Sequence, residues 1–307
     1  MPREEIMSDV KFIDRKTNDL VEEKIYGEDL IKWLYEGKGS SCILSFLTRP
    51  LFSKLYGLHQ SSFLSAKKIP QFIKDYHIPL KDFLPHEGRT EENPYKSFNE
   101  FFIRRFREEK RPFDKNSSRL PAFAEGRYFA YENVKDSDSF LIKNQELNLR
   151  ELVGEKYVST FAGGPLVIAR LCPVDYHRFH YFDDGSLLDF QELKGPLHSV
   201  NPLALQAKSS ILSTNQRQMS ILKTKNFGTV AYIEVGALCV GKIVQSASME
   251  KGSTFKRGEE KGYFLFGGST VVIVGQQNSF TLDNDIKENT QRGLETFLRL
   301  GESFAGH

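Results

Sequence analysis

The sequence has 307 residues, which is enough for one large domain or two moderate ones with a buried core. Charged residues make up 27% of the chain and hydrophobic residues 39%, a composition typical of a soluble globular protein and not of a disordered or membrane-embedded one. The formal net charge of +2 argues neither for nor against nucleic-acid binding, and we expect no nucleic-acid partner.

The cysteines and the N-terminal residues limit which cellular compartment the protein is expected to occupy. Cys42, Cys172 and Cys239 are widely spaced and lack CxxC spacing, so we expect no disulfide framework, no metal site and a reducing compartment. Residues 1–12 are too charged for a signal peptide. No run reaches the roughly 18 apolar residues that span a bilayer, so any membrane contact is expected to be peripheral.

The chain changes character near residue 120, and residues 1–119 are expected to be mostly helical. Apolar positions recur on one helical face over residues 28–38 and end at two glycines. Residues 40–66 are rich in Ile, Leu and Phe and nearly free of charge. Pro50 is expected to start a second helix there, because proline is tolerated in a first turn.

Helical spacing recurs twice more. Apolar residues at i, i+3, i+4 and i+7 predict a helix over residues 69–76. Ser97 and Glu100 fit a capping box, in which the serine accepts from the third residue's amide and the glutamate reaches back. The following helix is expected to carry a line of phenylalanines on one side. Its end is expected to gather the basic residues of 104–111, which suits the helix dipole.

From about residue 120 onward the pattern is that of β-structure. Short runs rich in Val, Ile and aromatic residues alternate with Gly and Pro. These runs are residues 165–171, 229–235, 239–244, 263–266 and 269–274. An amphipathic segment near residues 288–299 is expected to be a helix. The sequence therefore predicts an α+β fold, with a helical N-terminal region (1–119) and a β-rich catalytic domain (120–307) that carries a C-terminal helix.

Two glycines precede a serine between two predicted strands, in the sequence FGGST of residues 266–270. Glycine before the serine leaves the adjacent carbonyl sterically open and tolerates strained backbone angles. A serine hydroxyl needs this freedom in order to attack the carbonyl of the residue before it. The alternative is an ordinary glycine turn in a hairpin, after which Ser269 begins a strand.

Two histidines, His177 and His180, stand three residues apart in the sequence DYHRFH of residues 175–180. At this spacing they would share one face of a helical turn. Two tunable bases close together favour proton transfer. A pair of metal ligands is an alternative, although no third ligand stands at a recognisable spacing, and a surface turn is another.

A glutamate, Glu125, stands between Ala124 and Gly126 at the entrance to the β-rich part. Its carboxylate could orient a histidine, as the acid of a Ser-His-Asp arrangement does. On its own the motif is explained more simply by an exposed glutamate in a turn.

Together and in this order, the motifs resemble those of the phosphatidylserine decarboxylase family over residues 90–305. Family members carry LGST or GGST at the last motif, and this chain has the GGST form of prokaryotic members. The resembling segments are SFNEFFIR (97–104) with RP (111–112), DYHRFH (175–180), FGTVAYIEVGAL (227–238) and KGYFLFGGST (261–270).

The resemblance implies an enzyme that processes itself through a relay of acid, histidine and serine. By position, Ser269 is the nucleophile that cuts the backbone between Gly268 and Ser269, and His180 is its base. His177 is implied in proton handling during the decarboxylation itself. Where the family usually has aspartate before glycine, this chain has Glu125, which keeps the charge but is one methylene longer.

The resemblance also implies a covalent cofactor made from the chain. Ser269 would become a pyruvoyl group, so that no metal or dissociable cofactor is needed. Cleavage would give the chains 1–268 and 269–307, which stay associated. The pyruvoyl ketone would form a Schiff base with the serine amine of phosphatidylserine and accept the electrons left when CO₂ departs, which yields phosphatidylethanolamine.

The substrate implied by the family sits in a bilayer, so a peripheral location on the cytoplasmic face of the cell membrane is expected. Residues 40–66, with Lys67 and Lys68 beside them, suit an interfacial anchor. The alternative is that these helices pack on the β-rich domain or on a second copy of the chain in a homodimer.

Two other functions fit the same motifs. One is a pyruvoyl decarboxylase that acts on a soluble amino acid or on a different serine head group, although the apolar stretch counts against a soluble substrate. The other is a non-catalytic lipid-binding relative that does not process itself, and the departure at Glu125 is its only support.

Overall fold

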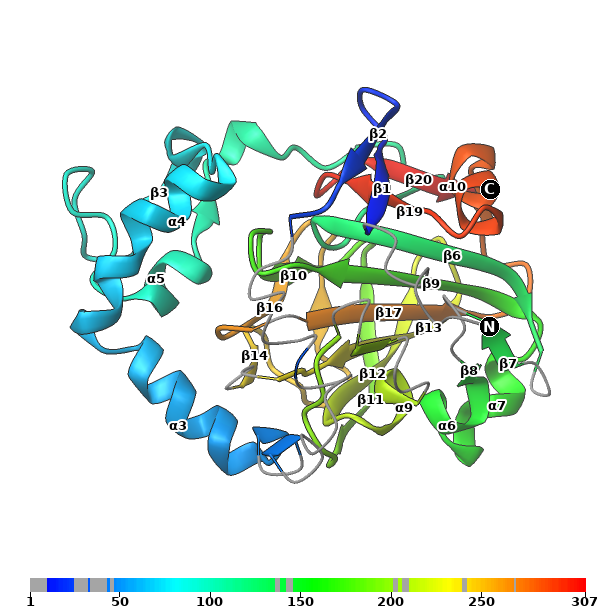
Figure 1. Cartoon of the computed structure of the whole chain (residues 1–307). Helices are drawn as coiled ribbons and strands as arrows, with labels where there is room; N and C mark the ends of the chain where they lie inside the picture. Colours follow the sequence, from blue (N-terminus) through cyan, green and yellow to red (C-terminus); the bar gives the residue numbers. More distant parts are fainter. Residues whose placement is uncertain are drawn as a thin grey trace, which may run out of the picture.

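The computed structural model of the chain describes residues 10–24, 33, 43–44, 47–135, 139–141, 146–200, 204–205, 210–238, 242–267 and 269–307. Figure 1 shows a large twisted β-sheet with a string of helices set to one side of it. The described part of the chain therefore has the α+β fold with a β-rich region that the sequence predicts.

A ten-stranded sheet forms the centre of the described structure, in the order β15-β11-β12-β13-β17-β9-β6-β19-β1-β2. Neighbouring strands are antiparallel, except that β1 pairs with β19 in parallel. The first two strands of the described residues thus join the same sheet as β19, which lies near the C-terminal end of the chain. The strands are β1 (Lys11–Asp14), β2 (Asp19–Glu22), β6 (Gly126–Val134), β9 (Gly164–Leu171), β11 (Gly185–Leu193), β12 (Arg217–Thr224), β13 (Thr229–Val235), β15 (Thr254–Phe255), β17 (Ser269–Gly275) and β19 (Glu295–Leu298).

Four smaller sheets surround this one. One joins β10 (Arg178–His180), β16 (Glu260–Phe264) and β14 (Ile243–Gln245), and another joins β18 (Thr281–Leu282), β20 (Ser303–Gly306) and β5 (Arg119–Pro121). The last two sheets are antiparallel pairs, β3 (Phe83–Leu84) with β4 (Arg105–Phe106), and β7 (Ser139–Leu141) with β8 (Glu146–Asn148).

Strands β9 and β17 are mostly apolar because both faces of the sheet are covered. Every residue of both strands is buried, which explains why apolar residues do not alternate with exposed polar ones, although β9 contains Arg170 and β17 begins with Ser269 and Thr270. The strands expected at 165–171, 229–235 and 269–274 are confirmed. The strand expected at 263–266 begins earlier and ends at Phe264, and that expected at 239–244 is described only from residue 242, with β14 starting at Ile243.

Residues 50–110 form a separate layer at the side of the sheet, which we call the helical arm (Figure 1). Proline lies in the first turn of α3 and of α4, so the predicted start at Pro50 and the predicted helix over 69–76 are confirmed. The arm contains α3 (Pro50–Gln60), the 3₁₀ turns η1 (Phe63–Lys68), η2 (Leu80–Asp82) and η3 (Glu108–Lys110), α4 (Ile69–Tyr76) and α5 (Phe98–Phe102). Outside the arm lie α6 (Leu149–Val153), α7 (Glu155–Phe161), α9 (Ile211–Thr214) and α10 (Asn284–Gln291).

The arm has a small aromatic core of its own. One residue of that core, Phe266, comes from the loop between β16 and β17, so the arm packs directly on the chain that leads to Ser269. The buried members are Ile69, Phe72, Tyr95, Phe98, Phe101, Phe102 and Phe266.

The capping box at α5 forms, but the helix is shorter than expected. The Ser97 hydroxyl accepts from the Glu100 amide at 3.2 Å, while the Glu100 carboxylate reaches the amide of Lys96 rather than that of Ser97. The helix ends at Phe102, so the prediction that residues 104–111 load its end with positive charge is wrong. The Arg104 guanidinium is instead buried, where it donates to the carbonyls of Val174 and Asp175.

The predicted C-terminal helix lies earlier in the chain than expected. It spans Asn284–Gln291, and Gly293 follows it with a positive φ of 72°. Glu295–Leu298, expected to be helical, form β19 between β6 and β1, because their apolar residues complete the sheet. The helix expected over 28–38 lies outside the described residues, apart from residue 33. None of the helices described here is long and apolar enough to span a membrane.

Candidate active site

Ser269 is the first residue of β17, a central strand of the large sheet. Its backbone is paired with Leu171 on β9, and its side chain is fully buried. The hydroxyl oxygen forms no hydrogen bond to any described residue. A buried hydroxyl without a partner is costly and is therefore uncommon in folded proteins, so this oxygen is a candidate for a reacting group.

The two residues before Ser269 are glycines. Gly267 has φ = 139°, a region of backbone space that residues with a side chain rarely adopt. Gly268, the predicted site of cleavage, lies outside the described residues. The glycine at 267 therefore allows a backbone turn, directly before the strand, that another residue would strain.

His177 lies at this turn. Its ring is fully buried and stacks on Phe102 of the arm, with 3.8 Å between ring centroids. Nδ1 lies 3.0 Å from the Asp175 carbonyl oxygen, which can only accept, so Nδ1 carries the proton and Nε2 a lone pair. Nε2 has no hydrogen-bond partner among the described residues.

The surroundings of His177 keep its ring neutral. Burial lowers the pKa of His177 well below its usual range, and the positive charge of Arg104 lowers it further. The backbone groups of Asp175 and Gly267 act on this pKa in the opposite direction, because they favour the charged ring. The effect of Gly267 also places the ring beside the segment that leads to Ser269.

His180 meets different surroundings, so the expected helical turn that would place both histidines on one face is wrong. His180 ends the strand β10, where its Nδ1 lies 2.9 Å from the Gly258 carbonyl oxygen. Its Nε2 lies 3.4 Å from the Tyr176 hydroxyl, and Phe113 packs nearby with 5.6 Å between ring centroids. Burial also lowers the pKa of His180.

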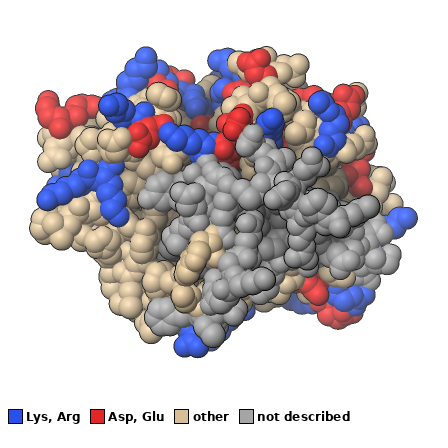
Figure 2. Space-filling view, viewed as in Figure 1, with Lys and Arg blue, Asp and Glu red and all other residues tan. Residues whose placement is uncertain are grey.

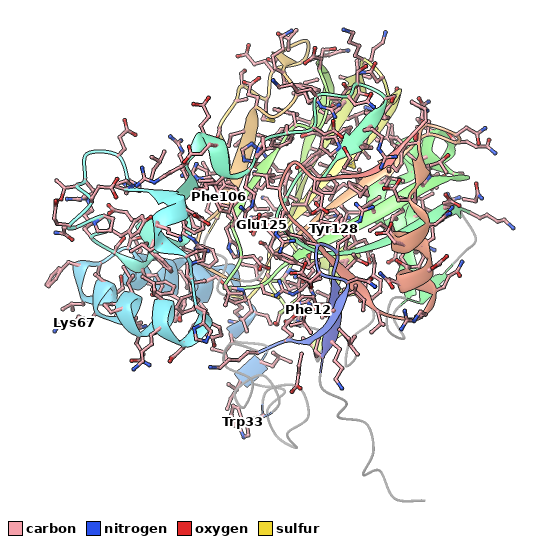
Figure 3. The ribbon with its side chains drawn as sticks, turned by 90° about the horizontal axis from the view of Figure 1, so that it is seen from above. Phe12, Trp33, Lys67, Phe106, Glu125 and Tyr128 are labelled. Atoms are coloured by element: carbon pink, nitrogen blue, oxygen red, sulfur yellow. The ribbon has the colours of Figure 1, made fainter. Side chains whose placement is uncertain are left out.

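Glu125 is buried, so the alternative of an exposed turn glutamate is wrong. Arg111 holds its carboxylate with two hydrogen bonds, of which the one from Nη2 to Oε1 is 2.9 Å long, and the Leu300 amide donates a third. The Arg111 guanidinium in turn lies over the Phe106 ring, and Figure 3 shows Phe106 and Glu125 where the arm meets the sheet.

The predicted relay is only partly assembled. The His180 amide donates to the Phe123 carbonyl at 2.8 Å, which brings the two segments side by side. Within the described residues, however, no hydrogen bond joins Glu125 to His180 or joins Ser269 to either ring.

A buried ionic cluster lies behind His177, and it was not predicted from the sequence. Arg127 forms an ion pair with the Asp175 carboxylate and another with Glu23, at 2.8 Å. Arg170 pairs with Glu23 at 2.7 Å and with Glu295 at 2.6 Å. Burial raises the pKa of Asp175, while Arg127 holds the charged form in place. The cluster fixes the turn whose Asp175 carbonyl orients His177.

A signal for this cluster was present in the sequence. Arg127 and Arg170 are charged residues within otherwise apolar strands, and the register of β6 and β9 places them opposite each other. Buried arginines are nearly always paired, so each predicts a buried acid nearby. The acids themselves come from distant parts of the chain and could not be found from spacing.

No group of three or more His, Cys, Asp or Glu side chains suited to hold a metal ion occurs in the described ranges. The groups that the described structure brings to the site are a buried hydroxyl, two buried imidazoles and a glycine turn.

Known proteins resemble this chain over almost its whole length. The profile of the phosphatidylserine decarboxylase family matches residues 98–306. A phosphatidylserine decarboxylase proenzyme of Clostridium perfringens is 39% identical over 296 residues, covering 96% of this chain and 98% of the relative. One from Fusobacterium nucleatum is 36% identical over 297 residues, covering 96% of this chain and 97% of the relative.

Proposed function

Since the chain belongs to the phosphatidylserine decarboxylase family and is a decarboxylase, we propose that it acts on phosphatidylserine after cutting its own backbone before Ser269. The cut would turn Ser269 into a covalent pyruvoyl group. The names of the relatives support this proposal, because a proenzyme is made as a precursor that must be processed.

The observation that carries the proposal is the buried, unpartnered Ser269 hydroxyl at the end of a glycine turn. A pyruvoyl group fits this position because it has no hydroxyl to satisfy and would be shielded from bulk water by the sheet and the arm. When present, the group supplies the electron acceptor that decarboxylation requires.

Self-cleavage needs a nucleophile and a base. The Ser269 oxygen would attack the Gly268 carbonyl carbon while His180 takes the hydroxyl proton, so that an ester replaces the peptide bond and the Ser269 nitrogen becomes an amine. Loss of the Ser269 α-proton then breaks the bond from Cβ to oxygen and releases the Gly268 carboxylate. Water finally replaces the amine nitrogen, which leaves as ammonia.

The assignment of His180 as base requires a rearrangement. Its Nε2 must leave the 3.4 Å contact with the Tyr176 hydroxyl, and Glu125 must share or leave its pair with Arg111 to act as the acid of the relay. The backbone hydrogen bond from the His180 amide to the Phe123 carbonyl supports this assignment, because Phe123 stands two residues before Glu125.

His177 is proposed to handle protons in the decarboxylation. Its Nε2 lone pair faces away from the Asp175 carbonyl, and its lowered pKa keeps that lone pair unprotonated and makes the protonated ring a ready donor to the substrate carbon. Phe102 covers the ring and limits access of water.

The two products of cleavage are expected to stay together. Residues 269–307 include β17, which is paired along its length with β13 on one side and β9 on the other. The same residues supply β19, which lies between β6 and β1. Cutting one peptide bond leaves all of these strand pairings in place.

We further propose that the arm contacts the membrane, on its cytoplasmic face. Leu51, Leu55 and Leu58 of α3 are 59–67% exposed, and Phe63 and Leu64 of η1 continue this apolar surface. Figure 2 shows a largely uncharged area at the lower left, where Figure 1 places α3. Lys67, labelled in Figure 3, lies on the outer side of the arm, where it could meet anionic head groups. A second copy of the chain is the competing partner for this surface.

The proposal is tested by intact-mass measurement of the purified protein. Wild type should give two chains, 1–268 and 269–307. The second chain should be lighter by one ammonia than a chain that begins with an intact Ser269, because a pyruvoyl group has replaced the serine. The Ser269→Ala variant should stay whole. CO₂ should be released from vesicles that contain phosphatidylserine and not from free serine. A single uncut wild-type chain would instead support a non-catalytic lipid-binding relative.

A further inference from the structure

One side chain in the arm joins the outer helix to the loop that precedes Ser269. Asn99 lies on α5, is buried, and uses both of its amide functions. Its Nδ2 donates to the Ser61 hydroxyl at 2.7 Å and to the Gly57 carbonyl at 3.2 Å, both at the C-terminal end of α3. Its Oδ1 accepts from the Phe266 amide at 3.0 Å.

The residue that Asn99 holds is the last one before the glycine turn. The Phe266 ring packs against Phe98 and Phe102 of α5, at 5.1 and 5.0 Å, and against Tyr56 of α3, at 5.7 Å. Phe102 also stacks on His177, so the loop and the imidazole share one support. Beyond Phe266, Gly267 has no side chain through which the arm could hold it.

We propose that Asn99 is a positioning residue for self-cleavage, which anchors the Phe266 amide so that the carbonyl before Ser269 stays within reach of its hydroxyl. This inference rests on the proposed function, because it concerns the cut that forms the pyruvoyl group. Described residues on both sides of the proposed cut are held in place, Phe266 by the Asn99 amide and Ser269 by its pairing with Leu171. A displacement of about 1 Å between reacting groups can slow a reaction by about 100-fold.

A variant series separates positioning from packing. Asn99→Leu keeps the size of the side chain and removes all three hydrogen bonds. Asn99→Asp keeps an oxygen that accepts from the Phe266 amide, but it loses the two hydrogen bonds that the Asn99 Nδ2 group donates to α3. Ser61→Ala leaves Asn99 in place and removes one of its two acceptors on α3.

Ser65→Ala is the matched control. The Ser65 hydroxyl is also buried in the arm, where it accepts from the Phe98 amide at 2.9 Å and donates to the Gln60 carbonyl at 2.8 Å. Within the described residues, it makes no hydrogen bond with the loop from Phe264 to Gly267. Its loss should therefore weaken the arm without moving the scissile segment.

The test follows the appearance of the chain 269–307 by denaturing gel and mass spectrometry after synthesis is stopped. Asn99→Leu should cleave about 100-fold more slowly than wild type, Asn99→Asp less slowly, and Ser65→Ala within about threefold of wild type. Ser61→Ala should fall between the control and Asn99→Leu. The kcat of any matured Asn99 variant should fall less than its cleavage rate, because the cut frees Phe266 from residue 269.

The outcomes distinguish the inference from the proposed function. If wild type is not cleaved, the proposed function fails. If wild type is cleaved and Asn99→Leu is no slower than Ser65→Ala, the inference is overturned. Should Asn99→Leu fail to fold, which the melting temperature in a Ser269→Ala background reports, Asn99→Asp and Ser61→Ala decide in its place, and cleavage of both at the wild-type rate overturns the inference.

Discussion

The sheet and the helical arm hold the candidate site in different ways. Ser269 is held by its backbone, which pairs with Leu171 at the start of a strand whose residues are all buried. The loop before it is held by side chains of the arm, through the Phe266 ring and its amide. The arm also leaves large apolar residues exposed on α3, whereas the central strands expose none.

This difference suggests that the sheet and the arm have different roles. Residues in the centre of the sheet should determine whether the chain folds, because they belong to the large core. Residues of the arm should determine how fast the chain matures and whether it reaches a lipid surface. The two histidines belong to different regions, since His177 packs on Phe102 of the arm and His180 contacts the loop before β16.

The histidines give the largest expected effects. Replacing His180 by glutamine should slow self-cleavage by about 10²–10⁴-fold, the usual contribution of a general base. Replacing His177 by glutamine should allow cleavage but prevent release of CO₂ from phosphatidylserine vesicles. Gel analysis and a CO₂ assay on the same preparations measure the two steps separately.

His307→Gln is the control for these variants, because its ring stacks on Phe227 at 5.3 Å in the C-terminal segment. It should change neither step. The opposite result, a block of cleavage by His177→Gln alone, would assign the base to the ring beside Gly267 and make the arm the region that controls processing.

Core truncation should separate the two regions by stability. Ile273→Ala in β17 removes a fully buried side chain and should lower the free energy of unfolding by about 2–5 kcal/mol. Leu55→Ala on α3, where the side chain is 59% exposed, should change it by less than about 0.5 kcal/mol. Denaturant unfolding in the Ser269→Ala background measures both on an uncut chain, and equal losses would contradict these different roles.

Much of the fold could be predicted from sequence because local patterns coincide with the final environment. The runs that became β9, β13 and β17 are mostly apolar and rich in β-branched residues, and the prolines of α3 and α4 mark true helix starts. The errors arose where tertiary contacts overrode local preference. Arg104 is drawn into the core by two carbonyls, and residues 295–298 complete a sheet instead of extending a helix.

The residues of the candidate site could be predicted from sequence motifs, but the way they are arranged in space could not. The buried hydroxyl of Ser269 lies where a strand-start serine after two glycines suggests. The separate surroundings of His177 and His180 follow from a turn and a strand that the i, i+3 spacing did not indicate. The contacts of Asn99 could not be predicted from the sequence, because its partners lie about 40 residues before it and far after it in the chain.

The exposed leucines of α3 give a smaller effect, on binding. Leu58→Ser should weaken binding to vesicles of phosphatidylserine and phosphatidylcholine by about tenfold, because full burial of a leucine is worth about 1.5–3 kcal/mol and only part of it enters the bilayer. Leu20→Ser on β2, which is 55% exposed but lies outside the arm, is the control. Sedimentation with vesicles measures both variants. Equal binding by both, together with a Leu58→Ser chain that no longer self-associates, would assign the surface to a second copy.

The smallest expected effect is that of mild acid on maturation. Burial lowers the pKa of His177 and of His180 below the ordinary value of about 6.5. An ordinary imidazole would lose about tenfold of its neutral form by pH 5.5, so the cleavage rate should fall by less than that between pH 7.5 and pH 5.5. A larger fall, with an acid limb at or above pH 6.5, would contradict the burial of the base.

The same pKa shifts have a consequence for stability whose sign is fixed by linkage. Between the lowered pKa of each folded ring and about 6.5, the unfolded chain binds more protons, so this contribution to stability is lost as the pH falls through that window. In the Ser269→Ala background, Phe102→Leu should uncover His177 on the arm side only and make the melting temperature depend less on pH. His180 has no contact with Phe102 among the described ring pairs, so a rise in the acid limb of cleavage in a Phe102→Leu chain that keeps Ser269 would mean that the arm, through His177, and not the sheet provides the base.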